Sequence, residues 1–580
     1  MKNKCAGQKL KFWMMEDLSD AWTGWLHQCV KQAINGSAGL FILIFIFAGA
    51  IFANDVQITN AEIKDQNTSG KTAEVEFDLS WQNAWSDSVN HDAVWIFFKY
   101  SSDGGTTWNH ATMKNSGTNP SGFSYGSRAS GNFTTLEMVV PADKKGVFIK
   151  PGHLGSGYVD FDNLNVVWDY GADGPNDPYT PWVTPNASFQ IRAHAIEMVY
   201  IPEEGFYLGD GSNGSVGQFE FGGSTSSLPG VISSEEELSF GTAATQWYYN
   251  TDNGAANDVA SGSVFQVSES FPKGFQAFYL MKYEITEGQY VDFLNSLLRP
   301  QQNRRVHSDT SGDTITYNYV MENYTSSQYR NTIRLPSSGS GYGTNPALTF
   351  YTDRPDRATA FLTWMDLAAY ADWAALRPIT ELEFEKAARG PLYPVTSELA
   401  WGNSSSAACA TIDGVAEDGT EYCYDGAHRA NYDSTTLAGL DGGQGPVRAG
   451  FFAQASFSTR YESGAGYYGN MELSGNVWEQ VVTLGNAAGR GFSGTHGDGR
   501  LTGLAISGYE GNATNSDWPG INQGNYSYGA YGADGSGWKG GGWDENSGAL
   551  QVSNRYYAAY GTPTRHYSTG GRVARTADNS

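Results

Sequence analysis

The sequence predicts an α+β protein in which a strand-rich region precedes a second region with few helices. Three features predict this class. Residues 55–195 contain β-branched and aromatic residues in partly alternating order and show no helical stripe. Residues 281–297 and 366–390 place apolar side chains at helical spacing. Residues 391–580 are rich in Gly, Asn, Ser, Tyr and Trp without helical periodicity, which indicates turns and long loops.

Length and charge limit the possible functions. A chain of 580 residues exceeds what one hydrophobic core usually serves, so we expect two or three domains. The 36 basic and 61 acidic residues give a formal charge of −25. A surface this acidic argues against a nucleic-acid partner, because phosphates need basic side chains. It is compatible with divalent cations and with neutral, sugar-like or peptide ligands.

The first 53 residues predict an export segment. Residues 38–53, "AGLFILIFIFAGAIFA", form an uncharged apolar run of 16 residues with several lysines before it. This run is shorter than the ~20 residues that a membrane-spanning helix needs. We therefore expect a signal peptide over residues 1–53. The alternative is an uncleaved membrane anchor, which would add a membrane contact. Both interpretations place the rest of the chain outside the cytoplasm, either extracellular, at the cell surface or periplasmic.

The cysteines predict a disulfide bond. Cys5 and Cys29 fall in the leader, so Cys409 and Cys423 remain in the exported protein. Export makes a disulfide between them plausible, whereas their spacing and lack of neighbouring histidines make a poor zinc site. The nine histidines show no spacing typical of an iron site, so we expect no iron.

Residues 54–195 predict an all-β sandwich domain. The segments "AEVEFDLSW" (73–81) and "AVWIFFKYS" (93–101) are its clearest strands. The next segment, "SSDGGTTW" (101–108), matches the Asp-box pattern of sialidase-like proteins. Its aspartate and two glycines predict a tight hairpin, and we expect that role and no other.

Residues 196–580 predict the second domain. Thr286 and Gln289 form a capping box before a helix. Residues 366–390 predict two further helices separated by Pro378, the second capped by Thr380. Residues 301–345 are polar and lack a pattern, so we expect a surface insertion there.

Several segments of this second domain resemble the formylglycine-generating enzyme, or sulfatase-modifying factor, family. The matching stretches are "MVYIPEEGFYLGD", "MKYEITEGQYVDFLN", "LRPITELEFEKAARG", "ELSGNVWEQ", "WKGGGW" and "GRVAR". Their combination is specific, although each stretch alone is weak. The resemblance implies a variant C-type-lectin-like fold over residues 196–575. It implies nothing about residues 55–195.

The resemblance also implies a structural calcium ion. In that family the segment matching "ELSGNVWEQ" wraps calcium, which takes six to eight oxygen ligands. The implied ligands here are the Glu472 side chain, the carbonyls of Gly475 and Val477, and the Glu479 carboxylate. The alternative is that Glu479 caps the turn or pairs with an arginine.

A second calcium site of the family resembles residues 431–441. Its implied ligands are Asn431, the Tyr432 carbonyl and Asp441. The spacing in this chain differs from the family pattern.

The chain departs from the family at the catalytic position. Catalytic members carry two copper-binding cysteines after the Gly-rich strand, whereas this chain has Glu545 and Leu550 about there. A carboxylate and a leucine cannot replace thiolates around a soft Cu(I) ion. We therefore expect no copper, no catalytic residues and no formylglycine-forming activity.

The C-terminal segment predicts a binding surface instead. Tyrosine gives a large contact area, and small polar residues adapt their hydrogen bonds. In lectin-like proteins diversified by retroelements, the variable region has this terminal position and this composition. Two interpretations stay open, a diversified face and Asn- and Tyr-rich loops without diversification. The predicted ligand-binding residues are Trp543, Asp544, Asn546, Tyr556, Tyr557, Tyr560, His566 and Tyr567.

Three functions are compatible with these features. The first is an exported, non-catalytic protein that binds a protein, peptide or glycan ligand. The second is a formylglycine-generating oxidase, which the family resemblance favours and the missing cysteines oppose. The third is a structural or adhesion protein of the cell surface, which an acidic chain with an added sandwich would suit.

Overall fold

The computed structural model describes residues 56–173, 190–212, 217–251, 257–409, 411–413, 421–424, 429–433, 443–453 and 459–578. The predicted export segment 1–53 and the predicted calcium ligand Asp441 lie outside these residues. Within the described ranges, no helix is both long enough and apolar enough to cross a membrane.

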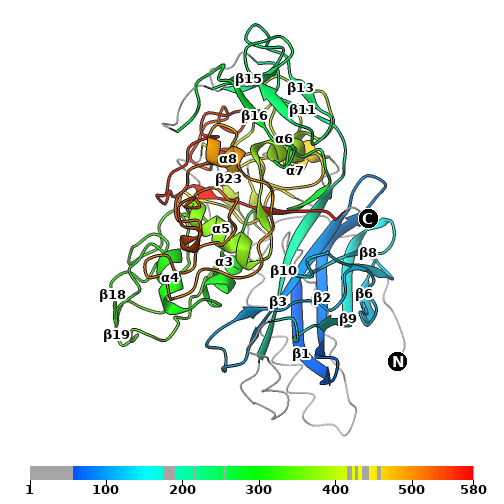
Figure 1. The fold of residues 1–580 in the computed structure, drawn as a ribbon, viewed down its shortest axis with the longest axis vertical. Helices are drawn as coiled ribbons and strands as arrows, with labels where there is room; N and C mark the ends of the chain where they lie inside the picture. The colour runs from blue at the N-terminus through cyan, green and yellow to red at the C-terminus, as the bar shows by residue number, and fades with distance from the viewer. Residues whose placement is uncertain are drawn as a thin grey trace, which may run out of the picture. The chain divides into compact units, whose positions relative to one another are not determined.

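A four-stranded sheet forms one layer of the N-terminal region (Figure 1). Along β2, buried and partly exposed residues alternate from Thr72 to Trp81, as a half-buried strand requires. The predicted strand 73–81 lies within β2. In spatial order the strands are β1 (Gln57–Asn67), β2 (Thr72–Ser86), β9 (Gly155–Trp168) and β6 (Ser127–Gly131).

A second, nine-stranded sheet faces the first and continues into the C-terminal region. Its central strand β10 pairs with β3 on one side and with β17 on the other. In spatial order the strands are β20 (Arg377–Pro378), β26 (Val573–Thr576), β17 (Phe278–Met281), β10 (Gln190–Ile201), β3 (Asp92–Ser101), β8 (Val147–Pro151), β7 (Leu136–Val140) and β5 (Gly117–Thr118), with β4 (Asn109–His110) paired to β3.

Strand β3 is buried at all ten positions because both of its faces pack against hydrophobic cores. Val94, Ile96 and Phe98 point into the core between the two sheets. Trp95 and Phe97 point the other way, into the main core of the C-terminal region. A strand covered on both faces is expected to be apolar at successive positions. Residues 93–98, "AVWIFF", form such an apolar run.

The α+β class with few helices is confirmed. The separate all-β sandwich domain before residue 196 is not confirmed, because strand β10 spans the predicted boundary and shares its sheet with both regions. Sequence alone could not show this sharing, since β10 looks the same in an isolated sandwich and in a shared sheet.

The predicted helices and their caps are present. Thr286 and Gln289 form the capping box of α3, and Thr380 and Glu383 form that of α6. Gly390 ends α6 at φ 69°, a conformation that glycine adopts readily. The helices are α3 (Glu287–Leu294), α4 (Arg299–Arg305), α5 (Trp364–Trp373), α6 (Glu381–Arg389), α7 (Arg460–Ser463) and α8 (Ala487–Arg490), with a 3₁₀ turn η1 (Tyr526–Tyr528).

Short sheets fill the rest of the C-terminal region. The pairs are β11 (Phe206–Leu208) with β13 (Gly230–Ile232), β18 (Thr314–Ile315) with β19 (Gly339–Ser340), and β21 (Ile412–Asp413) with β22 (Tyr422–Cys423). A four-stranded sheet has the order β12 (Gln218–Phe221), β15 (Trp247–Asn250), β14 (Leu238–Phe240) and β16 (Phe265–Val267). A three-stranded sheet has the order β24 (Ser536–Lys539), β23 (Trp478–Val482) and β25 (Thr569–Gly570).

Part of the expected surface insertion 301–345 is buried. Val306, Ile315, Val320, Met321 and Ile333 belong to the main hydrophobic core. Their spacing follows neither helical nor strand periodicity because the segment is mostly irregular chain, so the pattern gave no sign of burial.

Two local predictions have direct structural counterparts. The Asp-box segment connects β3 to β4, and the Asp103 carboxylate accepts hydrogen bonds from the Thr106 and Thr107 amides at 3.1 and 2.9 Å. The structure joins Cys409 and Cys423 by a disulfide, with their Cα atoms 5.8 Å apart.

Candidate functional site

The "SGNVWEQ" segment leads from a glycine turn into β23. Gly475 has φ 93°, and a Cβ there would lie 2.7 Å from the Asn431 carbonyl oxygen, so the turn needs glycine. Residues 478–482 are buried along β23, between β24 and β25. The two neighbouring strands are the start and the end of the loop that holds the predicted ligand-binding residues.

Glu479 pairs with Arg572. The two side chains are buried and lie with Arg572 Nε 2.8 Å from Glu479 Oε2 and Nη2 2.7 Å from Oε1. The guanidinium also donates to the carbonyls of Met281, Lys282 and Met471. The sequence analysis gave an arginine pair as an alternative to calcium ligation by Glu479, and this is that pair. The positive charge of Arg572 explains how a carboxylate next to Trp478 is tolerated in the core.

Two further buried carboxylates surround the same guanidinium. Glu284 accepts hydrogen bonds from the Asn476 side chain and from the Val477 amide, the latter at 3.0 Å. Burial raises the pKa of Glu472 to about 7, although the Gly450 amide and nearby arginines lower it. Burial likewise raises the pKa of Glu284, and Arg572 lowers it.

The two predicted calcium segments lie against each other. Asn431 donates from Nδ2 to the Asn476 side chain at 3.3 Å and to the Gly445 carbonyl at 3.0 Å. Its Oδ1 is buried and has no hydrogen-bond partner in the described part of the chain. The Tyr432 side chain is 7% exposed.

These residues fit calcium only in part. Asn431 Oδ1 is a free oxygen of the kind that calcium prefers. Glu479, by contrast, already has a cation in Arg572. Among the residues that the structure describes, no three His, Cys, Asp or Glu side chains gather as a metal site. The calcium assignment of Glu472, Gly475, Val477 and Glu479 therefore stays a prediction.

The loop between β24 and β25 places the predicted binding residues Tyr557, Tyr560 and His566 around Trp538. Trp538 lies 5.8 Å from Tyr557, 5.0 Å from Tyr560 and 5.7 Å from His566, measured between ring centroids. Trp478 meets Tyr557 at 5.4 Å with perpendicular rings. These contacts connect β23, β24 and the loop.

A second aromatic group continues from the first. His566 contacts Tyr567 at 4.1 Å between ring centroids. Tyr567 then stacks on Tyr329 at 4.6 Å and lies 5.4 Å from Trp543. Trp543 is 2% exposed, and its Nε1 donates to the Tyr567 carbonyl at 3.3 Å. Trp543 therefore supports the loop from inside rather than facing a ligand.

A cavity of about 200 Å³ opens beside the first aromatic group. Of the eight predicted binding residues, Asn546, Tyr556 and Tyr557 line it, and Asp544 adjoins its wall residue Glu545. Trp543, Tyr560, His566 and Tyr567 do not line it. The full lining is Trp478, Glu545, Asn546, Gly548, Ala549, Asn554, Tyr556 and Tyr557.

The two positions that match the family's cysteines have different surroundings. Glu545 is half-buried in the cavity wall and accepts a hydrogen bond from Trp478. Leu550 is fully buried among Leu399, Trp401 and Ala430. A carboxylate thus faces the cavity, whereas the second position is part of the hydrophobic core.

Several residues of this site were not among the eight predicted ones, including Trp478, Glu545 and Tyr329. Trp478 and Glu545 were noticed for other reasons, as the motif tryptophan and as the position of a cysteine. Tyr329 lies in the patternless segment 301–345, where no sequence signal connects it with Tyr567.

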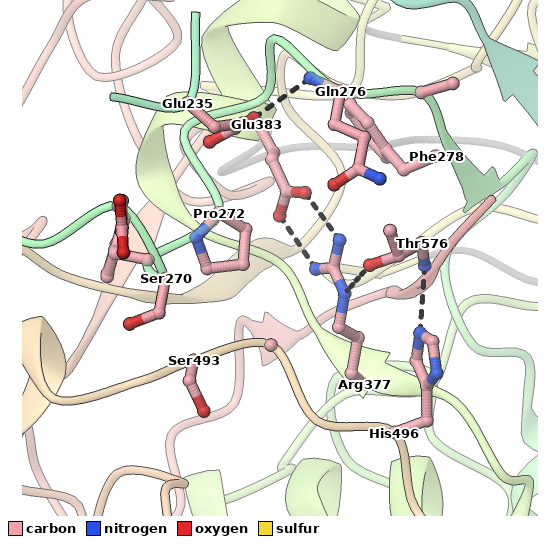
Figure 2. A pocket seen from close by; sticks show the side chains of 14 residues that line it. Glu235, Ser270, Pro272, Gln276, Phe278, Arg377, Glu383, Ser493, His496 and Thr576 are labelled. Carbon is pink, nitrogen blue, oxygen red and sulfur yellow. Dashed lines mark hydrogen bonds and ion pairs between the residues drawn. The ribbon is translucent and has the colours of Figure 1, made fainter. Parts of the chain in front are cut away.

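In a larger cavity, of about 360 Å³, several polar groups of the wall bind one another (Figure 2). Arg377 pairs with both carboxylate oxygens of Glu383, at 2.9 and 2.6 Å. The Thr576 amide donates to His496 Nε2 at 3.0 Å. Burial lowers the pKa of His496, so its ring is neutral. Arg377 thus connects β20 to α6, and His496 binds the end of β26, so these groups have a structural role.

The fold and the site define a non-repetitive α+β domain with an aromatic cavity on its C-terminal loop. Residues 270–577 match the Sulfatase-modifying factor enzyme 1-like domain family, and the chain belongs to this family. It is 33% identical over 132 residues to a formylglycine-generating enzyme of Thermomonospora curvata, and 27% identical over 134 residues to one of Bos taurus. Each alignment covers 22% of this chain and 34% of the relative, about a third of its length.

Proposed function

We propose that this chain is an exported binding protein in which the position of the family's catalytic cysteines has become a ligand pocket. One observation carries the proposal: Glu545 faces a cavity walled by Trp478, Tyr556 and Tyr557, while Leu550 is buried in the core. The cavity offers aromatic area and hydrogen-bonding groups, as small-ligand sites do. It offers no thiolate for Cu(I).

Export is supported by the predicted leader and by the disulfide between Cys409 and Cys423, which an oxidising compartment maintains. A protein, peptide or glycan remains the proposed partner. We propose calcium as a structural ion held on the Asn431 side of the "SGNVWEQ" turn.

Binding at the cavity can be tested without knowing the natural ligand. A panel of amino-acid amides, monosaccharides and alkylamines is screened by ligand-detected NMR against the wild-type protein and Tyr556→Ala. Tyr526→Ala is the matched control, because Tyr526 lies in η1, outside the cavity lining. Tyr526 is 51% exposed and Tyr556 is 38% exposed. At least one compound should bind wild type and Tyr526→Ala but not Tyr556→Ala. No difference among the three proteins would contradict the proposed site.

Formylglycine generation is the second candidate, because the chain belongs to the sulfatase-modifying family and both relatives carry that name. The protein is supplied with Cu(I), oxygen and a peptide containing Cys-x-Pro-x-Arg, with the Thermomonospora curvata enzyme as positive control. We expect no aldehyde. Formation of formylglycine would reverse the order of the two candidates.

A further inference from the structure

The acidic residue in the cavity wall, Glu545, has no cationic side chain as a partner among the described residues, and Asp544 lies next to it in the sequence. Asp544 and Glu545 are consecutive and half-buried, and no lysine or arginine forms an ion pair with either of them among the described residues. The Asp544 carboxylate accepts a hydrogen bond from the Tyr567 hydroxyl, while its Oδ1 is buried without a hydrogen-bond partner in that part of the chain. Burial raises the pKa of Glu545, and the charge of Asp544 raises it further. Burying two carboxylates without a cation is costly.

The histidine nearby does not supply that cation. Burial lowers the pKa of His566, and the charge of Asp544 raises it without overcoming burial. The ring is therefore neutral at pH 7. The two arginines of the loop are bound elsewhere: Arg555 pairs with Glu381, with Nε 2.7 Å from Oε2, and Arg565 pairs with Asp366.

Three aromatic side chains, Trp478, Tyr556 and Tyr557, line the cavity together with small and amide-bearing residues. Tyr556 and Tyr557 meet at 89° with centroids 4.6 Å apart, and Trp478 and Tyr557 meet at 90° with centroids 5.4 Å apart. The face of an aromatic ring carries negative charge density and attracts cations within about 6 Å of its centroid. These edge-to-face contacts fix the three rings relative to one another beside Glu545.

We propose that this cavity binds a cationic group, either an ammonium or a guanidinium, such as the end of a lysine or arginine side chain or an alkylated amine. The inference rests on the proposed function and specifies its ligand. Carboxylates and aromatic faces both attract a cation, and a space of about 200 Å³ suits the end of one side chain. An anion would be repelled, and a sugar would leave the Glu545 carboxylate without a counter-ion.

Other properties of the site agree with an organic cation rather than a metal ion. Aromatic rings do not ligate calcium or magnesium, which take oxygen ligands. The formal charge of the chain, −25, favours the approach of cations in general. The aromatic side chains of the lining then favour weakly hydrated organic cations over strongly hydrated ones, since the former pack best against rings.

The test compares cations with a neutral molecule of the same shape. Choline, N-acetyl-lysine methylamide and N-acetyl-arginine methylamide are titrated at pH 8 and low salt, with 3,3-dimethyl-1-butanol as the uncharged analogue of choline. Binding is measured by tryptophan fluorescence and calorimetry on the wild-type protein. At least one cation should bind tenfold or more tightly than the neutral analogue. Equal binding of choline and its analogue would overturn the inference.

Two variants test whether the cation binds beside Glu545. Glu545→Gln keeps the shape of the wall and removes its charge, and it should weaken cation binding at least tenfold. Glu236→Gln, which changes an exposed glutamate outside the cavity, should leave it unchanged. Thermal melts establish that both variants fold. Unchanged cation affinity in folded Glu545→Gln would refute the proposal.

The outcomes separate this inference from the proposed function. If only neutral compounds bind, and Tyr556→Ala abolishes that binding, the proposed binding site is supported and the proposed cationic ligand is refuted. If no compound binds and the peptide assay yields formylglycine, both proposals are overturned.

Discussion

Arg572 and Glu479 form a buried ion pair that connects the last strand region to the "SGNVWEQ" segment, with Nη2 2.7 Å from Oε1 and Nε 2.8 Å from Oε2. Both side chains are at most 1% exposed. The pair brings together residues 93 positions apart in the sequence and, through Arg572, three backbone carbonyls of other segments.

Removing one charge of this pair should strongly destabilise the protein. Glu479→Gln leaves the Arg572 guanidinium buried without its carboxylate, and we expect a loss of about 3–5 kcal/mol in the free energy of unfolding. Urea denaturation measures the loss. Asp353→Asn is the control, because the Arg334–Asp353 pair is exposed and should contribute at most about 1 kcal/mol. A loss that disappears when calcium is chelated would indicate that calcium, and not Arg572, holds Glu479.

Calcium should raise the melting temperature through Asn431. An ion that binds only the folded state stabilises it by about 2.7 kcal/mol at a concentration of 100 Kd. Asn431→Ala removes the buried Oδ1 and should reduce the calcium-dependent rise, while the Arg572–Glu479 pair stays intact. Differential scanning calorimetry with calcium or a chelator measures both effects. A wild-type melt that responds to neither addition would reject the ion.

Stability should fall as the pH rises toward 9 because of Glu322. Burial raises the pKa of Glu322 from 4.5 to about 9, and its Oε1 has no hydrogen-bond partner among the described residues. The folded state then binds more protons than the unfolded state between these values. The contribution of protonated Glu322 to the free energy of unfolding is therefore complete below about pH 4.5. It is lost as the pH rises to about 9.

Glu322→Gln should flatten this pH dependence and should be more stable than wild type at pH 8. Urea denaturation at several pH values measures the difference. Asp309→Asn is a suitable control, since Asp309 is exposed and two hydrogen bonds from Ser311 lower its pKa. Parallel pH curves for wild type and Glu322→Gln would show that Glu322 is not the responsible group.

Reduction of the disulfide should weaken the fold without unfolding it. Cys409 and Cys423 are 14 positions apart, so the bond closes a short loop. The chain-entropy model gives about 3 kcal/mol for a loop of this size. Melts with and without a reducing agent measure the change. Intact-mass analysis that finds two free thiols in the exported protein would contradict the bond.

Local signals predicted much of the fold because they depend on neighbouring residues. The capping boxes of Thr286 and Thr380 and the glycine at 390 are decided within one helical turn, and the structure has all three. The alternating pattern of β2 is local in the same sense. Long-range pairing is not local. Nothing in the sequence of β10 shows that it pairs with β3 on one side and β17 on the other.

The same distinction applies to the candidate site. The composition of residues 543–568 indicated a binding surface, and three of the eight predicted binding residues line the cavity. Composition could not show which side chains face inward. Trp543 and Tyr556 both looked like ligand contacts, yet one is 2% exposed and the other 38% exposed. The sequence left three roles open for Glu479, a calcium ligand, a cap of the turn or a partner of an arginine, because it does not show which group lies beside a buried carboxylate.

This difference between Trp543 and Tyr556 gives the last prediction. Trp543→Ala removes a buried ring that packs against Tyr567 and Tyr329, so it should cost about 3–5 kcal/mol of stability. Tyr556→Ala removes a partly exposed ring from the cavity wall, so it should leave the melt within about 0.5 kcal/mol of wild type. It should nevertheless weaken binding of the cationic probes by about 1–3 kcal/mol. Urea denaturation and calorimetric titration, run on both variants, measure these opposite effects. If Trp543→Ala proved stable and lost binding, whereas Tyr556→Ala kept it, the ligand would contact the second aromatic group around Tyr567 instead of the cavity at Glu545.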